Sequence, residues 1–174
     1  MATVFIGLGS NLSDPLQQVT QACAEIAALE KVRLIKTSSL YQSPPMGPSD
    51  QPDYINAVAE IATSLTPDEL LVELHAIEKH HGRVRTAQRW SARTLDLDIL
   101  LYGDKVINSE RLVIPHLGLY ERAFVLYPLL EIAPELVIPG YGEIGELAQN
   151  CERGSLKMVG NISSLSNNDN EKQT

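Results

Sequence analysis

The stretch that decides the fold is YINAVAEIATSLTPDELLVELHAIEKHHG, residues 54–82. Its first part, 54–62, alternates between two sets of side chains and predicts a strand. The motif TPDE at 66–69 is a capping box with proline at the first helical position. Apolar residues then recur at helical spacing over 70–77, and Gly82 ends the helix. A strand followed directly by a capped helix is therefore one unit of the fold.

The flanking sequence repeats this pattern. TVFIGL at 3–8 predicts a buried strand, and the periodicity of 14–29 predicts a helix that begins at Asp14-Pro15. Further strands are expected over 32–39 and 94–103, with 105–107 as the hairpin partner of the latter. The resulting order β-α-β-β-α-β predicts an α+β sandwich, with helices on one face of an antiparallel sheet.

Length and composition predict one domain. The chain has 174 residues, and 44% of them are hydrophobic. We expect a single domain over 1–159 and a polar, disordered tail over 160–174. Short helical pieces broken by prolines are expected after residue 113. No apolar run reaches the length of a membrane span and no signal peptide is visible, so we expect a cytoplasmic protein.

The charge is unevenly distributed. The formal net charge is −8, yet five of the 14 basic residues lie within 79–93, a segment without an acid. The acidic balance argues against general nucleic-acid binding, which needs a basic surface. An arginine-rich segment on an acidic protein is instead suited to one small anion, because arginine pairs with phosphate oxygens bidentately.

Asp96 and Asp98 follow this segment in the strand expected over 94–103. Residues i and i+2 of a strand point to the same face, so the two carboxylates lie together, with Leu97, Ile99 and Leu101 facing the core. Such a pair suits Mg²⁺ that shares its ligands with substrate phosphates. It is equally typical of a solvated strand face. The neighbouring arginines favour the first interpretation and indicate phosphoryl transfer.

Aromatic residues near these charges suggest a flat ligand. Trp90, the single tryptophan, lies inside the arginine-rich segment. Tyr54 and Asn56 share one face of the strand 54–62, and a ring beside an amide suits a planar heterocycle.

Two other patterns carry no function. The residues 140–145 match G-x-G-x-x-G, but no following strand completes a dinucleotide-binding unit, so a turn before a short helix is expected. His75, His80 and His81 do not share one helix face and are not expected to bind zinc.

Four segments together resemble a known family. They are GLGSNL (7–12), SPPMGPSDQPDYINA (43–57), GRVR…RW…RTLDLDILLYG (82–103) and VIPH…R (113–122). This combination is similar to 6-hydroxymethyl-7,8-dihydropterin pyrophosphokinase of folate biosynthesis. The resemblance implies a ferredoxin-like fold and an enzyme that transfers the pyrophosphoryl group of ATP to the pterin hydroxymethyl group, releasing AMP.

The resemblance also implies roles for individual residues. Asp96 and Asp98 would bind two Mg²⁺ ions, with Arg83 and Arg93 as catalytic residues. The positions implied for ATP are Glu78, Arg85, Trp90, Ile99, Arg111, His116 and Arg122. The positions implied for the pterin are Ser43, Pro44, Met46, Tyr54, Asn56, Trp90 and Phe124. Leu117 stands where some relatives have a tyrosine, and Val113 lacks a hydroxyl that some relatives have there.

Two alternatives remain open at the level of sequence. One is an ATP-dependent phosphotransferase that acts on another small heterocycle. The other is an RNA-binding module, since this topology also serves RNA recognition, although the strands lack its aromatic-rich pattern. The expected partners are small molecules, without nucleic acid or membrane, and the expected state is a monomer.

Overall fold

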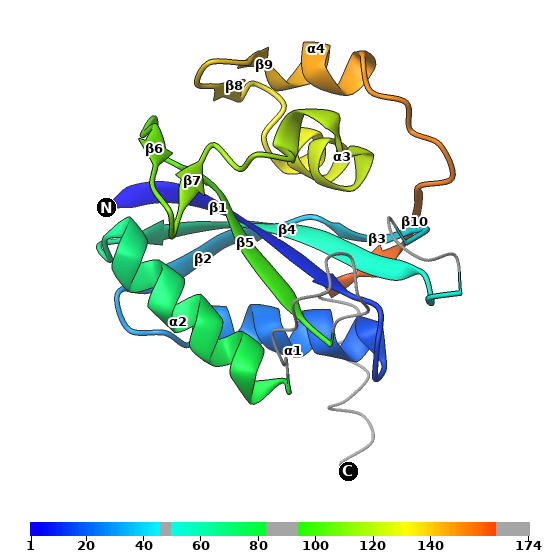
Figure 1. Cartoon of the computed structure of the whole chain (residues 1–174), viewed down its shortest axis with the longest axis horizontal. Coiled ribbons are helices and arrows are strands. Elements are labelled where there is room, and N and C mark those ends of the chain that lie inside the picture. The colour runs from blue at the N-terminus through cyan, green and yellow to red at the C-terminus, as the bar shows by residue number, and fades with distance from the viewer. Residues whose placement is uncertain (46–49, 83–93, 163–174) are drawn as a thin grey trace.

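The computed structural model describes residues 1–45, 50–82 and 94–162. A central antiparallel sheet has the strand order β10-β3-β4-β1-β5, with β2 also paired to β4 (Figure 1). Its strands are β1 (Ala2–Ser10), β2 (Val32–Thr37), β3 (Ser39–Ser43), β4 (Tyr54–Thr63), β5 (Asp96–Tyr102) and β10 (Lys157–Asn161). The predicted α+β fold is confirmed, and β4 and β5 flank β1 although they are far from it in sequence.

Helices cover both faces of this sheet. α1 (Pro15–Ala27) and α2 (Pro67–His80) lie on one face, and α3 (Ala123–Ile132) lies on the other, with α4 (Ile144–Gln149) packed outside it (Figure 1). The prediction of helices on one face alone is therefore wrong. Because both faces are covered, Ile61 is buried beneath α1 and α2, and Val58 is buried beneath α3.

The helix ends follow the local signals. Thr66 Oγ accepts a hydrogen bond from the backbone N–H of Glu69, and the Glu69 carboxylate accepts one from the N–H of Thr66, so the predicted capping box is confirmed. Gly82 follows α2 with a φ of +82°, the left-handed conformation that glycine adopts without strain. α1 begins at Pro15 as expected, although Asp14 makes no side-chain cap there.

The strand expected over 32–39 is interrupted at Ser38. The Ser38 N–H donates to the Val58 carbonyl at 2.8 Å, and the Val58 N–H donates to Ser38 Oγ, also at 2.8 Å. A side-chain oxygen thus replaces a backbone carbonyl in the ladder. The chain divides there into β2 and β3, and both strands pair with β4.

The segment after β5 differs from the predicted hairpin. β6 (Ile107–Asn108) pairs with β7 (Val113–Ile114) and not with β5. The N–H of Gly103 donates to the carbonyl of Thr3 at 2.7 Å, which extends the ladder between β5 and β1. The chain then turns away at Gly103, where φ is +53°.

Pro128 lies inside α3 without ending it, contrary to the expected break. A proline inside a helix costs about 3 kcal/mol, whereas full burial of one Val or Leu side chain contributes about 1.5–3 kcal/mol. α3 buries Val125, Leu126, Leu129 and Ile132. Packing on the sheet therefore outweighs the lost hydrogen bond.

A register shift lies between β1 and β5. Ile6 pairs with Ile99 and Phe5 pairs with Leu101, so Leu100 is an extra residue in β5. Leu97 and Ile99 face the core under α1 and α2 as predicted. Leu101 belongs to the core under α3, because the extra residue reverses the alternation.

Two of the three histidines within residues 75–81, His80 and His81, join the end of α2 to α1. The His81 side chain is 5% exposed, and its Nε2 lies 2.7 Å from a Glu25 oxygen. His81 Nδ1 contacts Gln18 Oε1, and His80 Nδ1 lies 3.3 Å from the other Glu25 oxygen. Among the described residues, no group of three or more His, Cys, Asp or Glu side chains could hold a metal.

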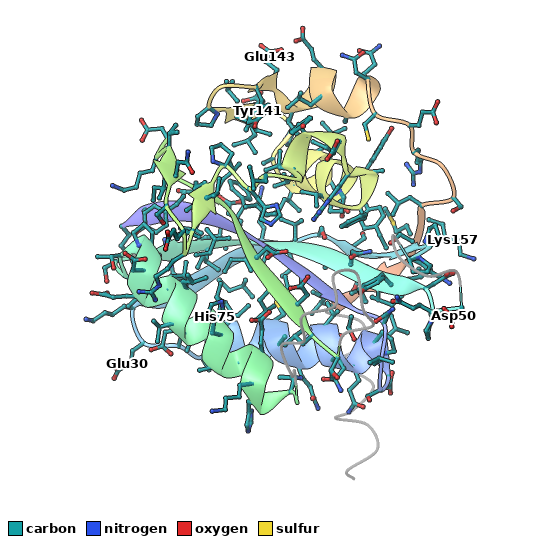
Figure 2. The ribbon with its side chains drawn as sticks, in the orientation of Figure 1. Glu30, Asp50, His75, Tyr141, Glu143 and Lys157 are labelled. Carbon is teal, nitrogen blue, oxygen red and sulfur yellow. The ribbon has the colours of Figure 1, made fainter. Side chains whose placement is uncertain are left out.

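The outer layer of the molecule lies beyond α3. Here β8 (Val137–Ile138) pairs with β9 (Gly142–Glu143), and α4 follows directly. Figure 2 shows Tyr141 and Glu143 at this periphery. The G-x-G-x-x-G match is thus a turn before a short helix, as predicted.

The C-terminal region of the described chain belongs to the sheet. β10 reaches Asn161, and Ile162 is buried. The predicted tail over 160–174 thus begins inside a strand, and its remainder, 163–174, lies outside the described residues. No helix in the described part of the chain is both long and apolar enough to span a membrane.

Candidate active site

Two glycines of β1 form the floor of a pocket. Gly9 pairs with Asn56 of β4 on one side and with Asp96 of β5 on the other. Gly7 lies in the same way between Val58 and Asp98. Because paired residues share a face of the sheet, two rows of side chains cross three strands, and the glycine in the middle of each row leaves open space.

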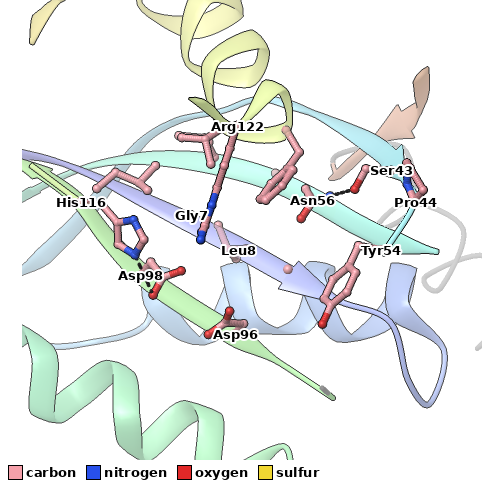
Figure 3. A pocket seen from close by; sticks show the side chains of 16 residues that line it. Gly7, Leu8, Ser43, Pro44, Tyr54, Asn56, Asp96, Asp98, His116 and Arg122 are labelled. Atoms are coloured by element: carbon pink, nitrogen blue, oxygen red, sulfur yellow. Dashed lines mark hydrogen bonds and ion pairs between the residues drawn. The ribbon is translucent and has the colours of Figure 1, made fainter. Parts of the chain in front are cut away.

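The pocket above this floor has a volume of about 260 Å³ (Figure 3). α3 and the segment before it close it from the side opposite α1 and α2. The lining residues are Gly7, Leu8, Gly9, Ser43, Pro44, Tyr54, Asn56, Ala57, Val58, Asp96, Asp98, Leu100, His116, Arg122, Phe124 and Val125.

One end of the pocket carries the two carboxylates. Asp96 and Asp98 project from β5 on the same face, as their spacing predicts (Figure 3). The Asp98 side chain is 37% exposed, and its Oδ1 lies 3.6 Å from Nε2 of His116. Two carboxylates cannot complete the octahedral shell of Mg²⁺, which fills its remaining positions with water and phosphate oxygens. The donor set therefore fits a magnesium ion bound together with a nucleotide.

His116 is fixed by backbone hydrogen bonds. The backbone N–H of His116 donates to the Leu100 carbonyl at 3.0 Å, and this bond ties His116 to β5. The N–H of Gly118 donates to Nδ1 of the ring at 3.2 Å. In the neutral ring the proton is therefore on Nε2, which faces Asp98 and the pocket.

The other end of the pocket carries an oriented amide. Asn56 Nδ2 donates to Ser43 Oγ at 2.8 Å, and both side chains are buried. The Asn56 Oδ1 atom faces Gly9 in the floor of the pocket. A Cβ atom built on Gly9 would lie only 3.1 Å from this oxygen. Tyr54 lies beside this amide (Figure 3). This end presents an acceptor and a ring, as a planar heterocycle requires.

The segment before β4 is held by Asn11. This side chain is buried, and its Nδ2 donates to Gln51 Oε1 at 3.2 Å and to the Pro52 carbonyl at 3.1 Å. It therefore ties the end of β1 to the chain that leads into Tyr54. The motif GLGSNL thus supplies both the glycine floor and an anchor for the amide end.

A family profile matches this chain. The profile of 7,8-dihydro-6-hydroxymethylpterin-pyrophosphokinase covers residues 5–134, which include the described part of the pocket. The chain belongs to this family. Its membership agrees with the resemblance seen in the sequence, and it leaves no support for the RNA-binding alternative.

Individual relatives agree with the family. The chain is 53% identical over 149 residues to 2-amino-4-hydroxy-6-hydroxymethyldihydropteridine pyrophosphokinase of Haemophilus influenzae, covering 86% of this chain and 92% of the relative. The enzyme of that name from Pseudomonas aeruginosa is 47% identical, covering 85% of this chain and 91% of the relative.

A solved structure shares the fold. A Plasmodium falciparum HPPK-DHPS chain with pteroate matches with a TM-score of 0.65 at 15% sequence identity. The match covers 85% of this chain and 42% of that chain.

Most of the site residues that the resemblance implies, and that the structure describes, lie together in the pocket. Asp96, Asp98, His116 and Arg122 meet at one end, and those implied for the pterin meet at the other, namely Ser43, Pro44, Tyr54, Asn56 and Phe124. Met46, Arg83, Arg85, Trp90 and Arg93 lie outside the described residues.

Three positions implied for ATP do not line the pocket. Ile99 is buried in the core beneath α1 and α2, on the opposite face of the sheet. Glu78 is also buried, and its Oε2 accepts a hydrogen bond from the Leu97 N–H at 3.0 Å. It thereby fixes the backbone between the two aspartates. Arg111 is exposed between β6 and β7.

The sequence interpretation missed the role of Gly7 and Gly9. The first strand was predicted over 3–8, yet β1 continues to Ser10 and contains both glycines. Glycine at i and i+2 places both gaps on one face of a strand, and that spacing was the available signal. Leu8, Ala57, Leu100 and Val125 line the pocket as well, and no feature of the sequence marks them.

Proposed function

We propose that this chain uses Mg²⁺ at Asp96 and Asp98 to transfer the pyrophosphoryl group of ATP to 6-hydroxymethyl-7,8-dihydropterin. The products are the pterin diphosphate and AMP, in tetrahydrofolate biosynthesis. Family membership and the two bacterial relatives carry the reaction itself. The metal and the roles of individual residues form the remainder of the proposal.

The row Asn56–Gly9–Asp96 is the observation that supports this assignment best. It spans two strand spacings, so the amide and the carboxylate lie about 10 Å apart on one surface. A pterin held at Asn56 would direct its hydroxymethyl group along this row. Phosphates held at the Asp96 end would meet it above Gly9.

The covalent step needs alignment more than a strong base. The hydroxymethyl oxygen forms a bond to the β-phosphorus of ATP, and the hydroxyl loses its proton. The bond from the β-phosphorus to the oxygen that bridges to the α-phosphorus breaks, and AMP leaves with that electron pair. Such displacements depend on positioning and on neutralisation of charge.

The phosphate end supplies donors for this charge. His116 presents Nε2–H, and Arg122 presents its guanidinium, beside the two aspartates. Two Mg²⁺ ions bound at Asp96 and Asp98 would stabilise the negative charge on the attacking and leaving oxygens. Two is the number that the family resemblance implies.

The heterocycle end supplies recognition. Tyr54 and Phe124 would enclose the pterin ring, Asn56 Oδ1 would accept a hydrogen bond from its edge, and Ser43 and Pro44 would border it. For Arg83, Arg85, Trp90, Arg93 and Met46 the proposed roles rest on the resemblance alone. We expect the enzyme to act on small molecules as a monomer.

Product analysis tests the proposal. Wild-type enzyme with ATP and the hydroxymethyl pterin should release AMP, in amounts equal to the pterin diphosphate, and only when Mg²⁺ is present. Stoichiometric ADP would instead indicate a simple phosphotransferase. Full turnover after removal of divalent cations with EDTA would refute the role given to Asp96 and Asp98.

A further inference from the structure

Gly118 lies so close to the Arg122 guanidinium that a side chain at position 118 would have to displace it. A Cβ atom built on Gly118 would lie 2.4 Å from Nε, 2.5 Å from Cζ and 2.9 Å from Nη2 of Arg122. Real Cβ atoms do not approach other atoms closer than about 3 Å, because carbon and nitrogen repel strongly below that separation. The backbone of Gly118 has a φ of −93°, which any residue can adopt. Space, and not conformation, therefore distinguishes glycine from other residues here, and the atoms that would have to move belong to the end of the Arg122 side chain.

The guanidinium of Arg122 is enclosed from a second direction. Arg122 immediately precedes α3, and its Cζ lies 5.8 Å from the centre of the Phe124 ring. That separation is within the range of a cation–π contact. With Gly118 and Phe124 both beside it, the side chain extends into the pocket toward the floor at Gly7 (Figure 3).

The backbone at Gly118 cannot easily retreat from Arg122. The Gly118 N–H donates to His116 Nδ1, and the Leu119 N–H donates to the His116 carbonyl at 3.1 Å. Leu119 is fully buried, and His116 is bonded to β5. A side chain at position 118 would therefore be accommodated by movement of the Arg122 guanidinium, the freer end of a flexible side chain.

We propose that Gly118 is a positioning residue that sets the place of the Arg122 guanidinium by having no side chain. Its N–H at the same time orients the His116 ring, so one residue aligns both donors of the phosphate end. This inference rests on the proposed function, in which Arg122 faces the phosphates of ATP. It predicts that any residue larger than glycine at position 118 weakens nucleotide binding while the pocket and the fold remain.

The test measures binding of an ATP analogue with a methylene bridge between the α- and β-phosphates, which the enzyme cannot cleave. Gly118→Ala should raise its Kd about tenfold, the factor that corresponds to about 1.4 kcal/mol. Arg122→Ala should raise the Kd at least as much. Gly118→Ala added to Arg122→Ala should then have no further effect, because the clashing group is gone.

Gly145→Ala is the matched control. Gly145 lies on α4, and a Cβ atom there would meet no atom within 4 Å. This variant should bind the analogue like the wild type. A shift of the Arg122 Nε–H resonance in Gly118→Ala, absent from Gly145→Ala, would report the displaced guanidinium independently of binding.

Each outcome separates the inference from the proposed function. Wild-type binding by Gly118→Ala, together with weakened binding by Arg122→Ala, overturns the inference alone. Wild-type binding by Arg122→Ala overturns the nucleotide role of Arg122 and the inference with it. If Gly118→Ala fails to fold, the Arg122→Ala background should restore folding; failure in both backgrounds would place the clash elsewhere and refute the inference.

Discussion

Replacement of Ser43 by alanine should separate pterin binding from nucleotide binding. The hydroxyl of Ser43 is the acceptor for Asn56 Nδ2 at 2.8 Å, and the two residues are 6% and 5% exposed. Without it, the buried amide group loses its partner, which costs about 1–3 kcal/mol of folding free energy. The amide also loses the bond that turns its oxygen toward Gly9.

The affinity for the pterin should therefore fall about tenfold, corresponding to about 1.4 kcal/mol. The affinity for the uncleavable ATP analogue should stay unchanged, because the phosphate end lies about 10 Å away across two strand spacings. Chemical denaturation gives the stability, and calorimetric titration gives the two dissociation constants.

Ser109→Ala is the control for Ser43→Ala, since Ser109 is exposed and its hydroxyl bonds to the backbone of Leu112 within its own turn. It should leave both affinities unchanged. Equal weakening of both ligands by Ser43→Ala, or an unchanged pterin affinity, would refute the assignment of Asn56 as an oriented acceptor.

Three further predictions concern the metal, a thiol and the contact between helices. Asp96→Ala and Asp98→Ala should each lower turnover by at least about a hundredfold, which corresponds to about 3 kcal/mol of activation free energy. The far-ultraviolet circular dichroism spectrum should stay native. Near-native turnover at saturating Mg²⁺ would contradict the metal site. Burial raises the pKa of the Cys23 thiol from 9.0 to about 11. The unfolded thiol therefore loses its proton first, and the free energy of unfolding should fall by up to about 3 kcal/mol as the pH rises from 9 to 11. Denaturation curves measured from about pH 9 to 11 should show a smaller decrease in the free energy of unfolding for Cys23→Ala than for the wild type. An equal decrease in both proteins would disprove the contribution of this thiol. His81→Phe removes the ring nitrogens that contact Glu25 and Gln18 of α1. It should lower the free energy of unfolding in urea by about 1–3 kcal/mol, whereas an unchanged unfolding midpoint would show that the contact is neutral.

Features of the fold that depend on neighbours in sequence were predicted correctly. The capping box at Thr66 closes within one helical turn, and the left-handed residue Gly82 ends the same helix. Asp96 and Asp98 share a face because they are two residues apart in a strand. In each case the determining contacts are local, so distant parts of the chain cannot alter them.

Features that depend on packing were missed. Pro128 was predicted to break the helix, yet α3 continues through it because the apolar side of α3 is buried on the sheet. Leu101 lies on the other face of the sheet from the one predicted, because Leu100 is an extra residue opposite β1. Local pattern cannot reveal such changes, since the deciding partner is another strand or the opposite layer.

The sequence by itself determined the chemistry of the site: paired carboxylates, an aromatic ring beside an amide, and the motifs that resemble a family. Only the tertiary structure decided that Asn56 and Asp96 lie in one row on either side of Gly9. It also decided that Gly118 faces Arg122, four residues along the chain. Residue types determine which chemical groups are available, whereas the spaces between them exist only after strands pair and α3 packs on the sheet. Gly9 and Gly118 contribute such spaces, because neither has a side chain to fill them.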